Sequence, residues 1–97
     1  MSRRQVKAER GAVQELEHCV GEGRRRINDG ERPVYHVITT FAGAAVDIRI
    51  RELPIIHVFV PDASGVVAGA RGLIAKTLGV APSAFEVRAD SRDIPAR

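Results

Sequence analysis

The sequence has no tryptophan and few other aromatic residues, so aromatic packing contributes little to any core. One tyrosine and three phenylalanines in 97 residues make up an aromatic fraction of 4%. Valine, isoleucine, leucine and alanine must fill the core, and each buries less apolar area than an aromatic side chain does. A chain of this length supports one domain, and a domain this small buries only about 60% of its unfolded surface. We therefore expect a marginal core that self-association or a partner stabilises, and predict a homo-oligomer.

Cysteine is nearly absent as well. Cys19 is the only cysteine, so no intrachain disulfide can form. No cysteine or histidine spacing is typical of a zinc site. The sequence therefore predicts neither a bound metal nor a cofactor, and it fits a reducing compartment.

Long apolar segments are also missing. No stretch approaches the roughly 18–20 apolar residues that a membrane span requires. The amino terminus carries arginines but no apolar segment of signal-peptide length. We therefore expect a cytoplasmic protein that does not contact a membrane.

The surplus of positive charge is small but clustered. The formal net charge is +3, and the basic residues gather in two runs before residue 33. Such runs can contact phosphate or an acidic partner, although a solvated surface is their more common role. The candidate nucleic-acid-binding residues are Arg3, Arg4, Arg10, Arg24, Arg25 and Arg26.

Residues 1–32 are predicted to form a helical, arginine-rich extension. Apolar residues recur near one face over residues 3–20, which favours a helix there. Gly21 and Gly23 are typical of a helix end. Residues 21–33 therefore look like a connector, with turn residues at 28–30.

Residues 33–89 are predicted to form an α+β domain. Val34 to Phe41 is rich in β-branched residues, and Ala45 to Glu52 alternates apolar and charged side chains, so we expect an antiparallel hairpin. After the break at Leu53-Pro54, Ile55 to Val60 is typical of a third, more buried strand.

A helix over 64–78 is expected next, with Asp62 or Ser64 as its cap and Gly79 as its stop. Ala84 to Ala89 is a candidate fourth strand. The predicted fold is thus a three-stranded antiparallel sheet, a helix and a fourth strand, preceded by an amino-terminal helix. The tail, residues 90–97, is expected to be flexible.

Several short motifs in this domain occur in an order that resembles a known family. They are Glu52-Leu53-Pro54, the helical segment 70–75, Leu78-Gly79-Val80, and the segment 82–87. Over residues 34–89 the chain resembles the HicB-like antitoxins. The resemblance implies a partial RNase-H-like fold and a protein that is not an enzyme. It also implies that the domain binds a small toxin ribonuclease, HicA, and occludes its active site.

The sequence departs from this family in three places. Gly43-Ala44-Ala45 stands where members carry bulky residues. Gly65, Ala68 and Gly69 replace acidic residues of the helix. Nothing after Val87 is expected to form the DNA-binding module of longer members.

The arginines of the predicted domain are the best candidates to bind a partner. Arg49 and Arg51 belong to the polar face of the second strand, and Arg71 belongs to the helix. A binding surface needs such anchors. The alternative for Arg71 is an ordinary solvated helix position. A second function remains open, in which the amino-terminal arginines of a nucleic-acid-binding regulator contact phosphate.

An enzyme is the least favoured hypothesis. His36 and His57 lie on strands that can be neighbours in such a sheet, but a surface histidine is the more common role. Carboxylates occur at Asp47, Glu52, Asp62 and Glu86, but their positions in the predicted elements do not bring them together in one metal site. Gly65, Gly69 and Gly72 fall inside the predicted helix. They form either a stripe without side chains, which lets another backbone approach closely, or an ordinary exposed face.

Overall fold

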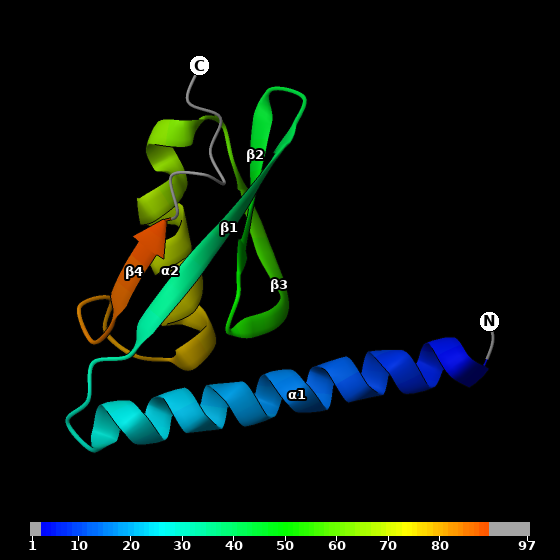
Figure 1. Ribbon diagram of the computed structural model, residues 1–97, viewed down its shortest axis with the longest axis vertical. Helices are drawn as coiled ribbons and strands as arrows, with labels where there is room; N and C mark the ends of the chain where they lie inside the picture. Colours follow the sequence, from blue (N-terminus) through cyan, green and yellow to red (C-terminus); the bar gives the residue numbers. More distant parts are fainter. Residues whose placement is uncertain (1–2, 90–97) are drawn as a thin grey trace.

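The computed structural model of the protein describes the backbone of residues 3–89 and the side chains of residues 11–89. The expected α+β class is confirmed, with two helices and a four-stranded sheet. Figure 1 shows these elements along the chain. In order they are α1 (Arg3–Asn28), β1 (Val34–Ala42), β2 (Ala45–Ile50), β3 (Leu53–Val60), the 3-10 turn η1 (Ala63–Gly65), α2 (Val66–Leu78) and β4 (Glu86–Ala89).

The sheet is mixed, with the strand order β3-β2-β1-β4. The first three strands pair antiparallel, as the hairpin pattern predicts, whereas β4 pairs parallel with β1. The three-stranded antiparallel sheet is thus confirmed, and the fourth strand, for which the sequence predicts no direction, joins it as a parallel neighbour of β1. The connection from β3 through α2 carries the chain back to the end of the sheet at which β3 began, so β4 runs parallel to β3 and to β1.

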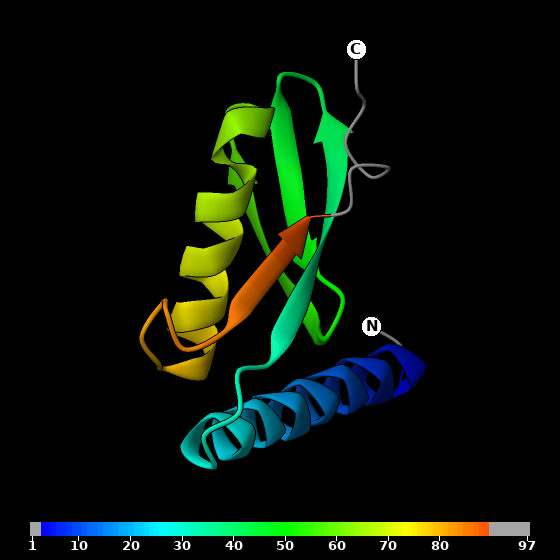
Figure 2. The same ribbon diagram turned by 60° about the vertical axis from the view of Figure 1, so that its left-hand side comes forward.

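The core lies between α2 and one face of the sheet (Figure 2). Alternation along β2 buries Val46, Ile48 and Ile50 on this face, as the sequence predicts. Ile74 of α2 is fully buried against them, and Leu73 is half-buried. Phe85, just before β4, is the largest fully buried side chain.

The first helix is longer than the sequence predicts. It continues through Gly21 and Gly23 to Asn28, so the expected connector over 21–33 is wrong for its first eight positions. Packing explains the difference: Leu16, Val20 and Ile27 contact the core, so tertiary contacts stabilise a helix that glycine alone would weaken. As Figure 1 shows, α1 runs across one end of the two layers that α2 and the sheet form.

Gly79 ends α2 as the sequence predicts, whereas α2 begins at Val66 rather than at residue 64 and its cap residue is Gly65, because residues 63–65 form the η1 turn. The carboxylate of Asp62 accepts a hydrogen bond of 3.0 Å from the backbone N–H of Ser64, which starts the η1 turn. Gly79 ends the helix in the left-handed conformation, with φ of 69°. The proposed glycine stripe is only partly exposed: a Cβ at Gly69 would lie 2.7 Å from Val60, whereas one at Gly72 would meet nothing within 4 Å. Gly69 thus brings α2 close to the sheet.

The start of β3 contains an unusual backbone conformation. The predicted strand over 45–52 ends at Ile50, and β3 begins at Leu53 rather than at the expected Ile55. The pairing of β2 with β3 shifts register between Arg49 and Ile50. Ile55 has a φ of 62°, a left-handed conformation that β-branched residues rarely adopt.

Candidate functional site

One face of the sheet packs against α2, and the other face points away from that helix. We call this second face the open face. By alternation from the buried positions of the three long strands, it carries His36, Ile38 and Thr40 of β1, Asp47 and Arg49 of β2, and His57 and Phe59 of β3. Register places Ile38, Arg49 and His57 in one row across the sheet. The next row holds Thr40, Asp47 and Phe59.

Asp47 is the centre of a polar network on this face. Its carboxylate accepts a hydrogen bond from Nε of Arg49 at 3.1 Å and lies 3.0 Å from Nδ1 of His57. Burial acts to raise the pKa of Asp47, but the hydrogen bonds from Arg49 and His57 outweigh it and leave the pKa below its usual value. Asp47 thus fixes the two side chains beside it.

The second histidine belongs to a separate pair. Glu52 accepts a hydrogen bond from the backbone N–H of His36 at 2.8 Å, and its other oxygen lies 2.5 Å from Nδ1 of the same residue. His36 and His57 do not lie on neighbouring strands, because β2 separates β1 from β3. Each histidine therefore has its own carboxylate.

Large apolar side chains are exposed beside this polar network. Phe59 is 54% exposed, and its ring packs edge-on against the His57 ring with centroids 5.5 Å apart. Ile38 is also exposed, directly across from Arg49. Aromatic residues and arginine surrounded by polar groups are typical of protein-binding surfaces.

The three candidate partner-binding arginines have different positions. Arg49 is exposed on the open face, and Arg51 is exposed in the turn after β2. Arg71 instead donates a hydrogen bond of 2.9 Å to the carbonyl of Pro82, and its guanidinium lies 5.9 Å from the centre of the Phe85 ring. Arg71 is therefore neither a freely solvated residue nor part of the open face, because it ties α2 to the loop before β4.

The arginine triplet of α1 makes intramolecular contacts. Arg24 donates to the carbonyl of Leu78 at 2.5 Å, which joins α1 to the end of α2. Arg25 pairs with Glu22 and Asp29. Arg26 pairs with Glu31, at 3.0 Å. Arg3, Arg4 and Arg10 lie outside the residues whose side chains the structure describes.

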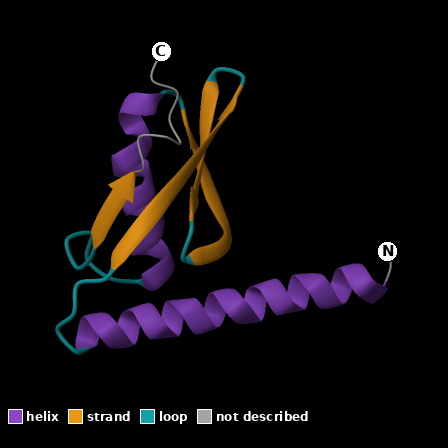
Figure 3. Cartoon of the chain, viewed as in Figure 1, coloured by secondary structure: helices purple, strands orange, loops and turns teal. Residues whose placement is uncertain are grey.

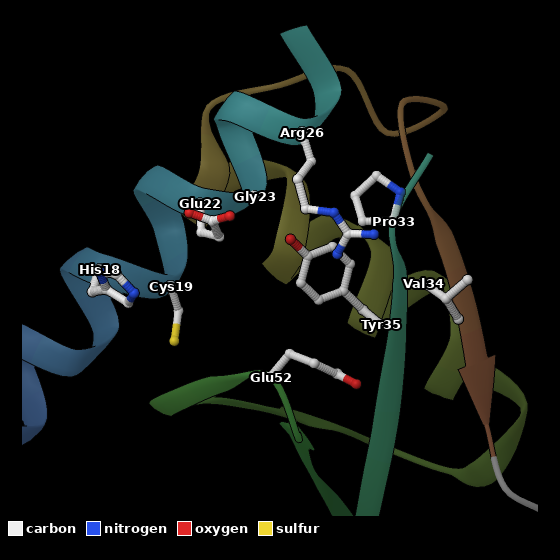
Figure 4. Close-up of a pocket in the computed structure, with 9 residues that line it drawn as sticks. All are labelled: His18, Cys19, Glu22, Gly23, Arg26, Pro33, Val34, Tyr35 and Glu52. Carbon is white, nitrogen blue, oxygen red and sulfur yellow. The ribbon is translucent and has the colours of Figure 1, made fainter. Parts of the chain in front are cut away.

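A cleft of about 290 Å³ lies between α1 and the start of β1 (Figure 4). Sequence reasoning missed it, because its walls come from segments far apart in the chain. Cys19, which we expected to be a small core residue, is half-buried and lines this cleft. The full lining is His18, Cys19, Glu22, Gly23, Arg26, Pro33, Val34, Tyr35 and Glu52.

Within residues 11–89 no group of three or more histidine, cysteine, aspartate or glutamate side chains is placed to hold a metal ion. Over the same described part of the chain, no helix is both long enough and apolar enough to span a membrane. Comparison of the chain with models of protein families, with curated proteins and with solved structures finds no match.

Proposed function

We propose that this protein is an antitoxin-type binding domain whose open face docks on a small toxin ribonuclease. The observation that carries the proposal is the open face itself, where Arg49 lies beside the exposed side chains of Ile38 and Phe59. A buried interface of this composition would draw its affinity from a few such anchors.

The order of elements gives further support. After α1 the chain forms three strands, a helix and a fourth strand. Figure 3 shows these strands in orange and the helix that connects the third strand to the fourth in purple. The four strands form one sheet. The HicB-like resemblance implies the same succession, and in that family the partner is the HicA toxin.

The polar network would act in recognition rather than in catalysis. Asp47 holds both Arg49 and His57 in place, so the open face presents charged groups that are already oriented before a partner arrives. Preorganised groups lose less conformational entropy on binding. Arg51 extends the same charged region beyond the end of β2.

Co-expression with any small basic protein that a neighbouring gene encodes tests the proposal. We expect a stable complex that blocks RNA cleavage, and we expect Arg49→Ala to weaken it at least tenfold. Lys76→Ala, at an exposed position of α2, is the matched control and should bind normally. Failure of any such neighbour to co-purify, or equal affinity of the two variants, contradicts the proposal.

Binding of nucleic acid is the second candidate. The observation that favours it is the exposure of Arg25, whose side chain is 59% accessible although it pairs with two carboxylates. Ion pairs at such exposure are weak and do not prevent phosphate contacts. Replacing Arg24, Arg25 and Arg26 with alanine should then weaken DNA binding and flatten its salt dependence. No binding by the unmodified protein at low salt removes this candidate.

A further inference from the structure

The cleft beneath α1 contains a tyrosine whose polar end has no protein partner. Tyr35 is only 4% exposed. Its ring packs edge-on against Phe85, with centroids 5.8 Å apart, and it reaches from β1 toward α1 (Figure 4). Among the described residues nothing makes a hydrogen bond with its hydroxyl. No side-chain polar atom of the described residues is both buried and without a partner, so the hydroxyl oxygen of Tyr35 is accessible from the cleft and free to bind a ligand.

The hydroxyl is a donor at neutral pH. Burial raises the pKa of Tyr35, and the charge of Glu52 acts in the same direction, whereas Arg26 lowers it. A ligand atom that accepts a hydrogen bond can therefore bind it.

The carboxylates of the cleft are already engaged. Both oxygens of Glu52 contact His36, and Glu22 pairs with Arg25. Arg26 donates from its Nε to Glu31, and its terminal nitrogens make no hydrogen bond with the described residues. The unsatisfied groups at the cleft are thus mainly donors, one of them on a cation.

The rest of the lining is apolar. Pro33 lies at the start of β1 on one side of the cleft, and Cys19 lines it from α1. Gly23 lacks a side chain where the tyrosine hydroxyl approaches, and a Cβ there would overlap that oxygen. An amphipathic molecule of modest size matches this combination of walls and donors.

We propose that this cleft binds a small, flat carboxylate, with its carboxyl group on the Tyr35 hydroxyl and the Arg26 guanidinium and its apolar body against Pro33. A guanidinium and a hydroxyl together suit a carboxylate, because charge-assisted hydrogen bonds are the stronger kind. This site is distinct from the open face, and it goes beyond the antitoxin-type function. Because the ligand would touch both α1 and β1, binding would also hold α1 in place.

Two native reporters make the test direct. Tyr35 is the only tyrosine in a chain without tryptophan, and Cys19 is the only cysteine. Benzoate is the probe, with benzamide as its uncharged counterpart. We expect benzoate to change the tyrosine fluorescence and to slow reaction of Cys19 with a thiol reagent, both saturating at about millimolar concentration.

Matched variants locate the carboxyl group. Tyr35→Phe keeps the ring and loses only the hydroxyl, so protection of Cys19 should require about tenfold more benzoate. Arg26→Gln should have a similar effect. Arg25→Gln changes the neighbouring arginine, which does not line the cleft, and should bind as the original chain does.

Three outcomes overturn the proposal. The first is the absence of saturable protection of Cys19 by benzoate in the folded, unmodified chain. The second is protection that is equal in Tyr35→Phe, Arg26→Gln and Arg25→Gln. The third is equal binding of benzamide, which would leave no role for the negative charge. None of these results bears on docking at the open face, so the two proposals fail separately.

Discussion

Gly23 of α1 lies against the hydroxyl of Tyr35 in β1, so closely that a Cβ at position 23 would overlap the oxygen atom. The same Cβ would lie 3.3 Å from a methyl group of Leu78 at the end of α2. A single glycine thus sets how near α1 approaches both the sheet and the second helix.

Substitution of this glycine should destabilise the fold. We expect Gly23→Ala to cost about 1–3 kcal/mol of unfolding free energy, because overpacking forces neighbouring side chains or the helix to move. Gly21→Ala is the control: a Cβ there meets nothing within 4 Å, so the higher helix propensity of alanine should stabilise by about 0.5–1 kcal/mol. Urea denaturation measures both. Equal effects of the two substitutions would contradict the close contact.

Ile55 should be more stable as glycine. Its φ of 62° costs a residue with a Cβ about 1–2 kcal/mol, and its side chain is 53% exposed, so little burial is lost. We expect Ile55→Gly to raise the free energy of unfolding by up to about 1 kcal/mol. Ile38→Gly, in a strand without positive φ, should instead destabilise. A loss of stability in Ile55→Gly would show that this side chain is needed for packing.

Asp47 should contribute to the acid sensitivity of the fold. Its pKa is lowered in the folded state, so its contribution is present above the unfolded pKa of about 3.9 and is lost as pH falls through the lower folded pKa. We expect Asp47→Asn to be less stable than the original chain at pH 7 and to lose less stability on acidification.

The control for Asp47 is Glu86→Gln. Glu86 is an exposed carboxylate of β4 that has no hydrogen bond or ion pair within the described residues. Unfolding free energies measured from pH 7 down to about pH 3 should separate the two variants. Parallel pH profiles for Asp47→Asn and the original chain would refute the role of the network.

Arg71 should act mainly on stability. Arg71→Ala removes the hydrogen bond to Pro82 and the contact with the Phe85 ring, and we expect a loss of about 1–2 kcal/mol. Lys76→Ala, at an exposed position of the same helix, should change stability by less than about 0.5 kcal/mol. Thermal unfolding checks both variants. Unchanged stability together with lost partner binding would identify Arg71 as an anchor instead.

Self-association should use the free edge of β3. This strand ends the sheet, and its Phe59 is exposed; unpaired strand edges bind further strands. We expect light scattering to show a dimer or larger oligomer that Phe59→Lys converts to a monomer. Ile38→Lys, on an interior strand of the same face, should leave the oligomer intact. A strict monomer at all micromolar concentrations would refute self-association.

Local signals in the sequence determined the elements of the domain. Alternation fixed the buried face of β2, because side chains in a strand point alternately to opposite faces. Asp62 and Gly79 marked the two ends of the helical segment, because a capping carboxylate and a left-handed residue satisfy backbone groups locally. Such signals act within a few residues and need no tertiary contact.

Only the tertiary structure determined how those elements pack, pair and contact one another. The length of α1 depends on packing of Val20 and Ile27 against the core, which no local glycine rule contains. The parallel pairing of β4, the tie between Arg71 and Pro82, and the cleft around Tyr35 each join segments separated by many residues. Their contacts form only after the chain has folded, because burial and close approach are properties of the assembled core rather than of any stretch of sequence.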